Sequence, residues 1–258
     1  IYDRAIFTVR SSSFDGVDTT TVFLTDPTVT TSVSYIVNIT SGIINSGGNQ
    51  TIPGESAHAE GTQTVAIGYG SHAEGINTQA IGANSHAEGF YTNAIGDNSH
   101  AEGYYTTAFG NNGSHAQGYY TTAIGLSSSS SGLYTKAIAN GSTASGYYTT
   151  ASGYNSNASG YYTTASGYYS HTEGQTTSAN GTSSHAEGYG SISSGSHSHA
   201  EGTSEALGEG AHSEGFFTYA IGDYSHAEGT LTFAIGNAAH AEGAATTTAL
   251  FQIGRPDF

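Results

Sequence analysis

The sequence predicts an all-β fold, a parallel β-roll or β-solenoid of fourteen 14-residue coils. A Gly occupies every seventh position from Gly61 to Gly243, with Ala139 replacing it once and with one-residue slips near Gly113 and before Gly208. Two kinds of heptad alternate, one containing His-x-Glu-Gly and the other Ala-Ile-Gly, so the repeating unit is fourteen residues long. Self-similarity at a short, fixed period is the signature of a solenoid, in which each unit buries surface only against its neighbours.

The expected coil consists of two short strands and two turns. Alternate side chains of a strand point to opposite faces, so in Ser71–Gly75 the side chain of Ala73 faces one way and those of His72 and Glu74 the other. The second half-coil, Thr78–Gly82, alternates in the same way. Because the two walls of so small a coil lie close together, the small residues must face inward, and the glycines are expected to supply turn dihedrals.

The repeat divides the chain into three parts. Residues 1–53 contain short β-branched segments bounded by turn residues, which predict a small N-terminal β-strand module or adaptor followed by a linker. Residues 54–246 form the β-roll, and residues 247–258 look like the start of a further C-terminal element.

Composition excludes several classes of function. The net charge is −16, with only four basic residues, so a nucleic-acid partner is not expected. The absence of cysteine removes disulfides and thiolate metal sites. No run approaches 18 apolar residues, so this segment is not expected to insert into a membrane.

An apolar row follows the outward position of the Ala-Ile-Gly half-coils. A roll with a small-residue interior buries little apolar area, and an exposed stripe of this length is a typical association surface. A rod with one such stripe closes most economically by rotational symmetry, and we expect a parallel homotrimer. The expected interface residues are Ile67, Ile81, Ile95, Phe109, Ile124, Ile138, Ile221 and Ile235, with Leu207 in the same row.

The alternating Ser-x-Ala-x-Gly heptads, as in Ser71–Gly75, Ser85–Gly89 and Ser99–Gly103, resemble the head repeats of YadA-like trimeric autotransporter adhesins. Similar Ser-His-Ala-Glu-Gly arrays occur in bacteriophage tail and fibre proteins. The resemblance covers about residues 54–243 and implies a left-handed roll assembled as a trimer. The adhesin heads commonly carry two aliphatic residues at the outward positions where one strand type here carries His and Glu, which leaves open which strand faces the three-fold axis.

The His and Glu positions form a ladder along the roll that is a candidate for chemistry. His and carboxylate side chains from adjacent coils could bind a divalent metal; the coils that best show this are those of His72, Glu74, His86, Glu88, His100 and Glu102. The alternative, which we prefer, is that each His pairs with a Glu of a neighbouring coil or subunit and fixes the register. Near-identical copies are the opposite of a unique catalytic site, so no catalytic residue and no cofactor are expected.

Three coils omit the His–Glu pair and are rich in aromatic pairs instead. Tyrosine rings suit polar ligands such as sugars, although such rows more often fill a groove between subunits. The candidate glycan-binding residues are Tyr147, Tyr148, Tyr161 and Tyr162.

The sequence therefore predicts a structural and adhesive fibre segment rather than an enzyme. The favoured setting is a virion appendage, such as a phage tail fibre or spike, that spaces or presents host-contacting surfaces. The alternative is the head of a bacterial surface adhesin that binds matrix or cells. The expected partners are two further copies of the chain, other tail, fibre or surface proteins, and a host glycan or surface receptor.

Overall fold

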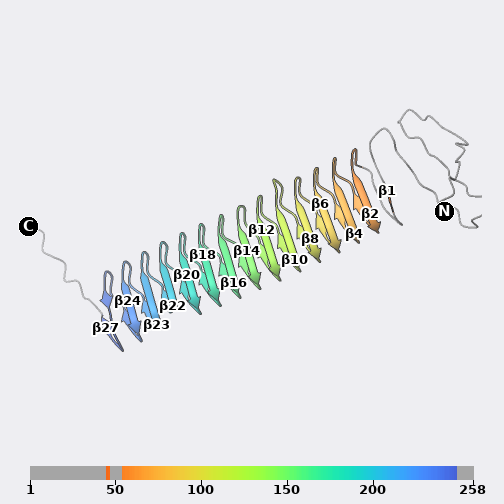
Figure 1. The fold of residues 1–258 in the computed structure, drawn as a ribbon. Coiled ribbons are helices and arrows are strands. Elements are labelled where there is room, and N and C mark those ends of the chain that lie inside the picture. Colours follow the sequence, from red (N-terminus) through yellow and green to blue (C-terminus); the bar gives the residue numbers. More distant parts are fainter. Residues whose placement is uncertain (1–44, 47–53, 249–258) are drawn as a thin grey trace, which may run out of the picture.

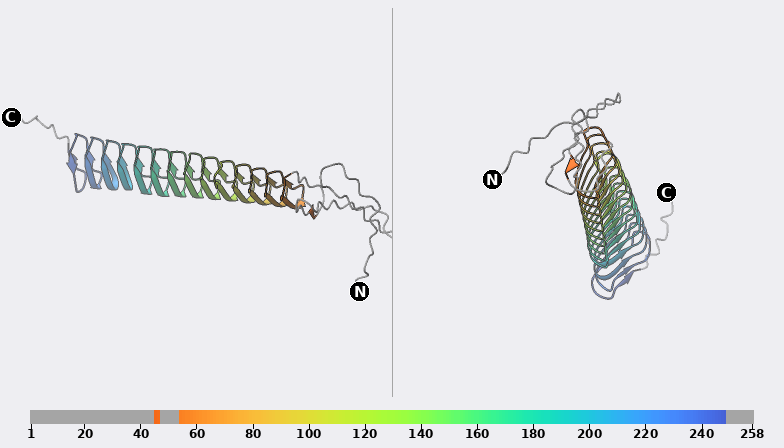
Figure 2. Two further views of the ribbon diagram at one scale, coloured as in Figure 1. Left: turned by 90° about the horizontal axis from the view of Figure 1, so that it is seen from above. Right: turned by 90° about the vertical axis from the view of Figure 1, so that its right-hand side faces the viewer.

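The structure, a computed structural model, describes residues 45–46 and 54–248. Figures 1 and 2 show one coil stacked on the next in a long, narrow, flattened rod. The short β-branched segments expected to form an N-terminal module, and nearly all of the expected C-terminal element, lie outside the described residues. The expected all-β solenoid of 14-residue coils is confirmed.

Most coils contribute one longer and one shorter strand, and in the coils of β22 and β23 a single continuous strand covers both positions. The longer strands begin at the His position of the repeat and are β2 (His58–Thr62), β4 (His72–Ile76), β6 (His86–Phe90), β8 (His100–Tyr104), β10 (His115–Tyr119), β12 (Ser129–Leu133), β14 (Thr143–Tyr147), β16 (Asn157–Tyr161), β18 (His171–Gln175), β20 (His185–Tyr189), β22 (His199–Ala206), β23 (His212–Ala220), β24 (His226–Thr230) and β26 (His240–Ala241). The shorter strands are β3 (Val65–Ala66), β5 (Gln79–Ala80), β7 (Asn93–Ala94), β9 (Thr107–Ala108), β11 (Thr122–Ala123), β13 (Lys136–Ala137), β15 (Thr150–Ala151), β17 (Thr164–Ala165), β19 (Ser178–Ala179), β21 (Ile192–Ser193), β25 (Phe233–Ala234) and β27 (Thr247–Thr248).

All pairing is parallel and runs from one coil to the next. Longer strands pair with longer strands, as where His72 lies opposite His86, and shorter strands pair with shorter ones, as where Gln79 lies opposite Asn93. The register places each residue beside its equivalent fourteen positions later, so every position of the repeat becomes a column along the rod. A functional side chain at one position of the repeat therefore recurs along the rod at the strand spacing of about 4.8 Å.

The core between the two walls contains only small side chains. Ala73 and Ala80 are fully buried, as are their equivalents along the rod, and the largest fully buried side chains are all threonines. Several core serines donate hydrogen bonds to a carbonyl three residues earlier, as Ser99 Oγ does to Gly96 O at 2.6 Å. The predicted inward and outward faces of both half-coils are confirmed.

The two sets of repeat glycines differ in backbone conformation but share one steric requirement. Gly75 has φ +115°, in the region that glycine favours. The expectation that the glycines supply turn dihedrals is therefore confirmed for the Gly75 set. Gly82 has no such φ, and that expectation is wrong for its set. A Cβ at Gly82 would lie 2.1 Å from the carbonyl oxygen of Gly96, and a Cβ at Gly75 would lie equally close to that of Gly89, at 2.1 Å, so both sets are required by the close approach of successive coils.

The two one-residue slips are accommodated differently. The extra residue near Gly113 lies in the turn before β10, where a Cβ on Gly113 would meet nothing. The missing residue after Gly202 falls within β22, which runs without interruption as β23 does, and the register to β23 shifts between Thr203 and Ser204. The expected loop adjustment is confirmed for the extra residue, whereas the missing residue is absorbed as an irregularity within a strand.

The solenoid sheet reaches slightly beyond the predicted β-roll at both ends. Strand β1 (Asn45–Ser46) pairs in parallel with β2, and β27 pairs in parallel with β25. Across the described residues, no helix is long and apolar enough to cross a membrane.

Replacing a coil-contact glycine should destabilise the rod more than replacing a turn glycine in open space. In Gly153→Ala the new Cβ would lie 1.9 Å from Gly167 O, so the coils must separate, and we expect a loss of about 3 kcal/mol or more in unfolding free energy. In Gly190→Ala nothing lies within 4 Å and only the positive φ is penalised, at about 1 to 2 kcal/mol. Urea unfolding followed by circular dichroism measures both, and equal losses would contradict the steric argument.

Candidate functional site

The His–Glu ladder lies on the outer face of the longer strands. Histidine occupies the first position of most of these strands and glutamate the third, and both point away from the alanine core. Successive imidazoles stack nearly parallel, with ring centroids 4.7 Å apart for His72 and His86 and 4.8 Å apart for His185 and His199. The coils without the pair divide the ladder into an N-terminal run, His58 to His115, and a C-terminal run, His171 to His240.

Each histidine approaches a carboxylate mainly within its own coil. His72 Nε2 lies 3.5 Å from Glu74 Oε2, and nine of the ten His–Glu ion pairs among the described residues have this arrangement. Only His199 reaches a neighbouring coil, at 3.5 Å from Glu187. The expected pairing between coils is therefore wrong for most of the ladder. Two residues that are two positions apart on one strand point to the same face, and their side chains come within reach of each other inside a single coil.

Burial favours the neutral form of several ladder histidines. The pKa of His115, His185 and His212 is lowered from its ordinary value of 6.5, first by desolvation and then by the neighbouring histidines. The nearby glutamates act in the opposite direction and only partly offset this effect.

The ladder contains side chains that can ligate a metal ion, but their ligand atoms do not converge on one point. The ligand atoms of His72, Glu74 and His86 lie within 4.8 Å of one another. Two ligands bound to one zinc ion at about 2.0 to 2.2 Å each can be no more than about 4.4 Å apart. His72 and Glu74 meet that limit, whereas the His86 ring is stacked parallel to that of His72, so its lone pair does not converge on the same point. The geometry supports His–Glu pairing more directly than metal binding.

The aromatic residues of the central coils form two columns beside the turn that follows each longer strand. The second residues of the pairs make the longer column, Tyr91, Tyr105, Tyr120, Tyr134, Tyr148 and Tyr162. Within it Tyr105 and Tyr120 stack at 4.9 Å with an interplanar angle of 2°. These tyrosines have positive φ, for example 55° at Tyr120, which is uncommon for a bulky residue, and the regular stacking helps to offset that strain.

Stacking determines which part of each tyrosine a ligand could reach. Because the faces cover one another along the rod, mainly ring edges and phenol hydroxyls are exposed, and face-to-face contact with a sugar is restricted. Desolvation and neighbouring tyrosines raise the pKa of Tyr105, Tyr120, Tyr148 and Tyr162, so these hydroxyls stay protonated and can donate hydrogen bonds. Of the four tyrosines proposed from the sequence, Tyr147 stacks on Tyr161 and Tyr148 on Tyr162, each pair at 4.9 Å.

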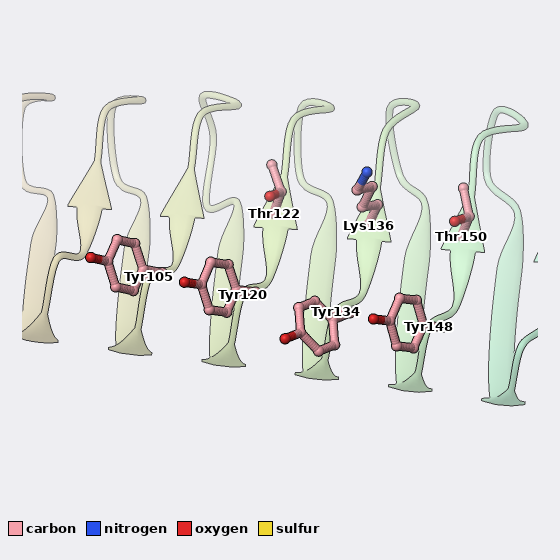
Figure 3. A pocket seen from close by; sticks show the side chains of 7 residues that line it. All are labelled: Tyr105, Tyr120, Thr122, Tyr134, Lys136, Tyr148 and Thr150. Carbon is pink, nitrogen blue, oxygen red and sulfur yellow. The ribbon is translucent and has the colours of Figure 1, made fainter.

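A pocket of about 350 Å³ opens where the aromatic columns are interrupted. It is lined by Tyr105, Tyr120, Thr122, Tyr134, Lys136, Tyr148 and Thr150. Of the four sequence candidates only Tyr148 belongs to it. Figure 3 shows the four tyrosines in a row with the two threonines and Lys136 on the adjoining shorter strands. Sequence reasoning missed this site, although the single lysine among the tyrosine-rich coils was a visible signal.

The apolar stripe lies on the shorter-strand side of the coils, one position after each shorter strand. Its members are exposed in the single chain, as at Ile67 and Ile124 (44% each) and Phe109 (56%), while Ile81 and Ile95 are half-buried. Between β15 and β21 the stripe becomes polar, and Ser166 Oγ donates a hydrogen bond to Asn180 Oδ1 at 2.8 Å. The stripe therefore has two apolar sections separated by a hydrophilic one.

Acid should weaken the rod through the ladder. A histidine whose folded-state pKa is lowered binds fewer protons than in the unfolded chain, so its stabilising contribution is complete above pH 6.5 and is lost as the pH falls toward the folded-state value. We expect the urea midpoint to fall between pH 7.5 and pH 5, and to fall less in a His185→Gln/His212→Gln variant. A midpoint with the same pH dependence in both proteins would contradict this assignment.

Comparison with known proteins places the repeat in a family. A family model described as the YadA head domain repeat (2 copies) matches residues 54–71, 59–85, 87–112 and 144–170. No curated protein matches the chain. The matched segments cover coils in two stretches of the solenoid, 54–112 and 144–170, and they confirm the resemblance stated from the Ser-x-Ala-x-Gly heptads. Over these residues the coils are similar to YadA head repeats, a structural, adhesin-like repeat family.

Proposed function

We propose that this chain is a structural and adhesive segment of a homotrimeric fibre. The observation that carries the proposal is the exposed apolar stripe on a rod whose own core contains nothing larger than threonine. Burying the exposed part of each large stripe residue contributes about 1 kcal/mol, and the stripe repeats this gain from coil to coil. A three-fold axis parallel to the rod buries the apolar stripes of all three chains against one another at the same time.

The shorter-strand face is the side we place toward the axis. It carries Ile67, Ile124 and Ile221, whereas the longer-strand face carries the His–Glu ladder with its column of carboxylates. Burying that ladder at a three-fold axis would bring three columns of negative charge together at low dielectric, which is costly. The ladder therefore faces outward.

The setting that we favour is a virion appendage, a phage tail fibre or spike that spaces or presents host-contacting surfaces. Two features support it, the Ser-His-Ala-Glu-Gly form of the repeat and the exit sequence Ala-Leu-Phe-Gln-Ile-Gly at residues 249–254, which resembles junctions into later tail-fibre domains. The second candidate, favoured by the match to the YadA head repeat, is the head of a bacterial surface adhesin that binds host matrix or cells. The fibre then works with other tail or surface proteins, and its own segment holds the host-contacting surface away from its base.

Charged substitutions in the stripe should separate the trimer. In Ile67→Asp/Ile124→Asp the mass measured by light scattering should fall from three chains of 26.3 kDa to one. The matched control is Tyr69→Asp/Leu126→Asp, which changes two exposed residues of the same coils, each two positions further along the chain. The control should remain trimeric; a native mass of one chain, or trimers in both variants, would contradict the proposal.

Immunogold labelling distinguishes the two settings. Antibodies raised against the roll should label the tail of intact phage particles if the chain is a virion fibre. Labelling of the outer surface of bacterial cells that release no particles would instead establish the adhesin.

A further inference from the structure

The charges along the rod are unevenly distributed. Residues 103–172 contain no Asp or Glu, and their only residue that is charged at neutral pH apart from histidine is Lys136. The coils before this section carry six acidic residues and those after it carry nine, namely Glu55, Glu60, Glu74, Glu88, Asp97 and Glu102, and then Glu173, Glu187, Glu201, Glu205, Glu209, Glu214, Asp223, Glu228 and Glu242. An anion is therefore repelled by both ends of the rod and attracted only to its middle.

Lys136 is free to act on a ligand. Its side chain is exposed and forms no ion pair with any described residue. The nearest acidic coil, that of Glu102, is two coils away, about 10 Å along the rod. That separation exceeds a Debye length of about 8 Å at physiological ionic strength, so the positive charge is not cancelled from there.

The pocket lies at a coil that departs from the aromatic pattern. Leu133 replaces the first tyrosine of the pair, and the Tyr134 ring tilts by 19° from that of Tyr120, with a centroid separation of 5.4 Å. Tyr119, having lost its stacking partner in the next coil, meets Tyr134 edge-on at 5.9 Å. The stack is thus opened beside Lys136 (Figure 3).

Hydroxyl groups line the pocket on both sides of the lysine. Lys136 is in register with Thr122 on β11 and with Thr150 on β15, and the tyrosine column runs beside them at the turns that lead into the shorter strands. A volume of about 350 Å³ lies within the range of small-ligand sites. The lining thus combines many neutral donors and acceptors with one positive charge.

We propose that this pocket, which we name the Lys136 pocket, binds a saccharide that carries a carboxylate. Lys136 pairs with the carboxylate, and the threonine and phenol hydroxyls bond to the sugar hydroxyls. A nucleic acid or other polyanion fits poorly, because one cation cannot neutralise several phosphates and the acidic ends repel the rest of the chain. The inference deepens the proposed function, on which it rests, by naming the ligand class of the host-contacting surface.

The pocket is compatible with the proposed trimer. Lys136 and the stripe residue Ile138 project from the same face two residues apart, so the pocket lies at the rim of the interface and occurs three times in the fibre. The hydrophilic section of the stripe begins in the next coil, at Ser152. The pocket is thus bordered by the stripe residues Ile124 and Ile138 in two of its coils and by Ser152 in the third, and water and a polar ligand enter from the Ser152 side.

Titration calorimetry on the full chain tests the proposal with two acidic probes that each carry one carboxylate, 3′-sialyllactose and galacturonic acid, and with lactose as the neutral counterpart of the first. At least one acidic probe should bind saturably and at least ten-fold more tightly than lactose. Lys136→Gln should lose that binding at least ten-fold, and Lys136→Arg should retain it. A preference for one acidic probe identifies the source of the carboxylate.

A swapped variant separates a built pocket from a charge alone. Gln79 occupies the equivalent position of an acidic coil, so Lys136→Gln/Gln79→Lys keeps the net charge but moves the cation out of the pocket. The swap should not restore binding. Restored binding in the swap, unchanged binding in Lys136→Gln, or saturable binding of neither acidic probe overturns the proposal.

The mass of each variant, measured in parallel, keeps the two proposals distinct. Binding by a chain of monomeric mass would leave the saccharide site standing and overturn the trimer. A trimer that binds neither acidic probe would do the reverse.

Discussion

The parallel hydrogen-bond ladder between residues one coil apart is the constraint on which the rest of the structure depends. It requires each coil to sit directly on the next, at strand spacing. The approach is so close that Gly68, Gly82 and Gly96 admit no Cβ, and the walls are so near to each other that alanine, serine and threonine fill the core. The rod is therefore held by backbone hydrogen bonds and small-residue packing, and its large side chains are all displaced to the outside.

That displacement explains why function on this rod takes the form of columns. A side chain at an outward position meets its own copies above and below, which produces stacked imidazoles, stacked tyrosines and rows of carboxylates. Columns of one chemistry suit extended association, such as a subunit interface. They suit a specific small ligand poorly, because neighbouring copies cover each other's faces. A specific site arises where a column is interrupted, as at Leu133 and Lys136.

Period and alternation were sufficient to predict most of the fold. Glycines at every seventh position and small residues at every second position of each strand predicted the coil, the inward face of Ala73 and the outward face of His72 and Glu74. The second set of glycines was misinterpreted because sequence spacing shows where a glycine recurs without showing what a Cβ would meet. The same-coil pairing of His72 with Glu74 and the mutual covering of the tyrosine faces depend on side-chain rotamers, which the repeat does not encode. The pocket was missed because repeats direct attention to what recurs, and Lys136 is an exception to the pattern.

The departures from the repeat pattern lie in the same section of the rod, and each of them has a physical effect on the same pocket. The coils without His–Glu pairs form part of the acid-free section, that section holds the only lysine, and the stripe turns polar close behind it. Removing the carboxylates lets a single cation retain its field, and removing one tyrosine gives that cation a cavity. Making the stripe hydrophilic beside the cavity keeps it accessible to water while the apolar sections on either side hold the chains together. A rod built from one repeated unit thus acquires a distinct middle by a few substitutions at outward positions, none of which disturbs the alanine core or the ladder between coils.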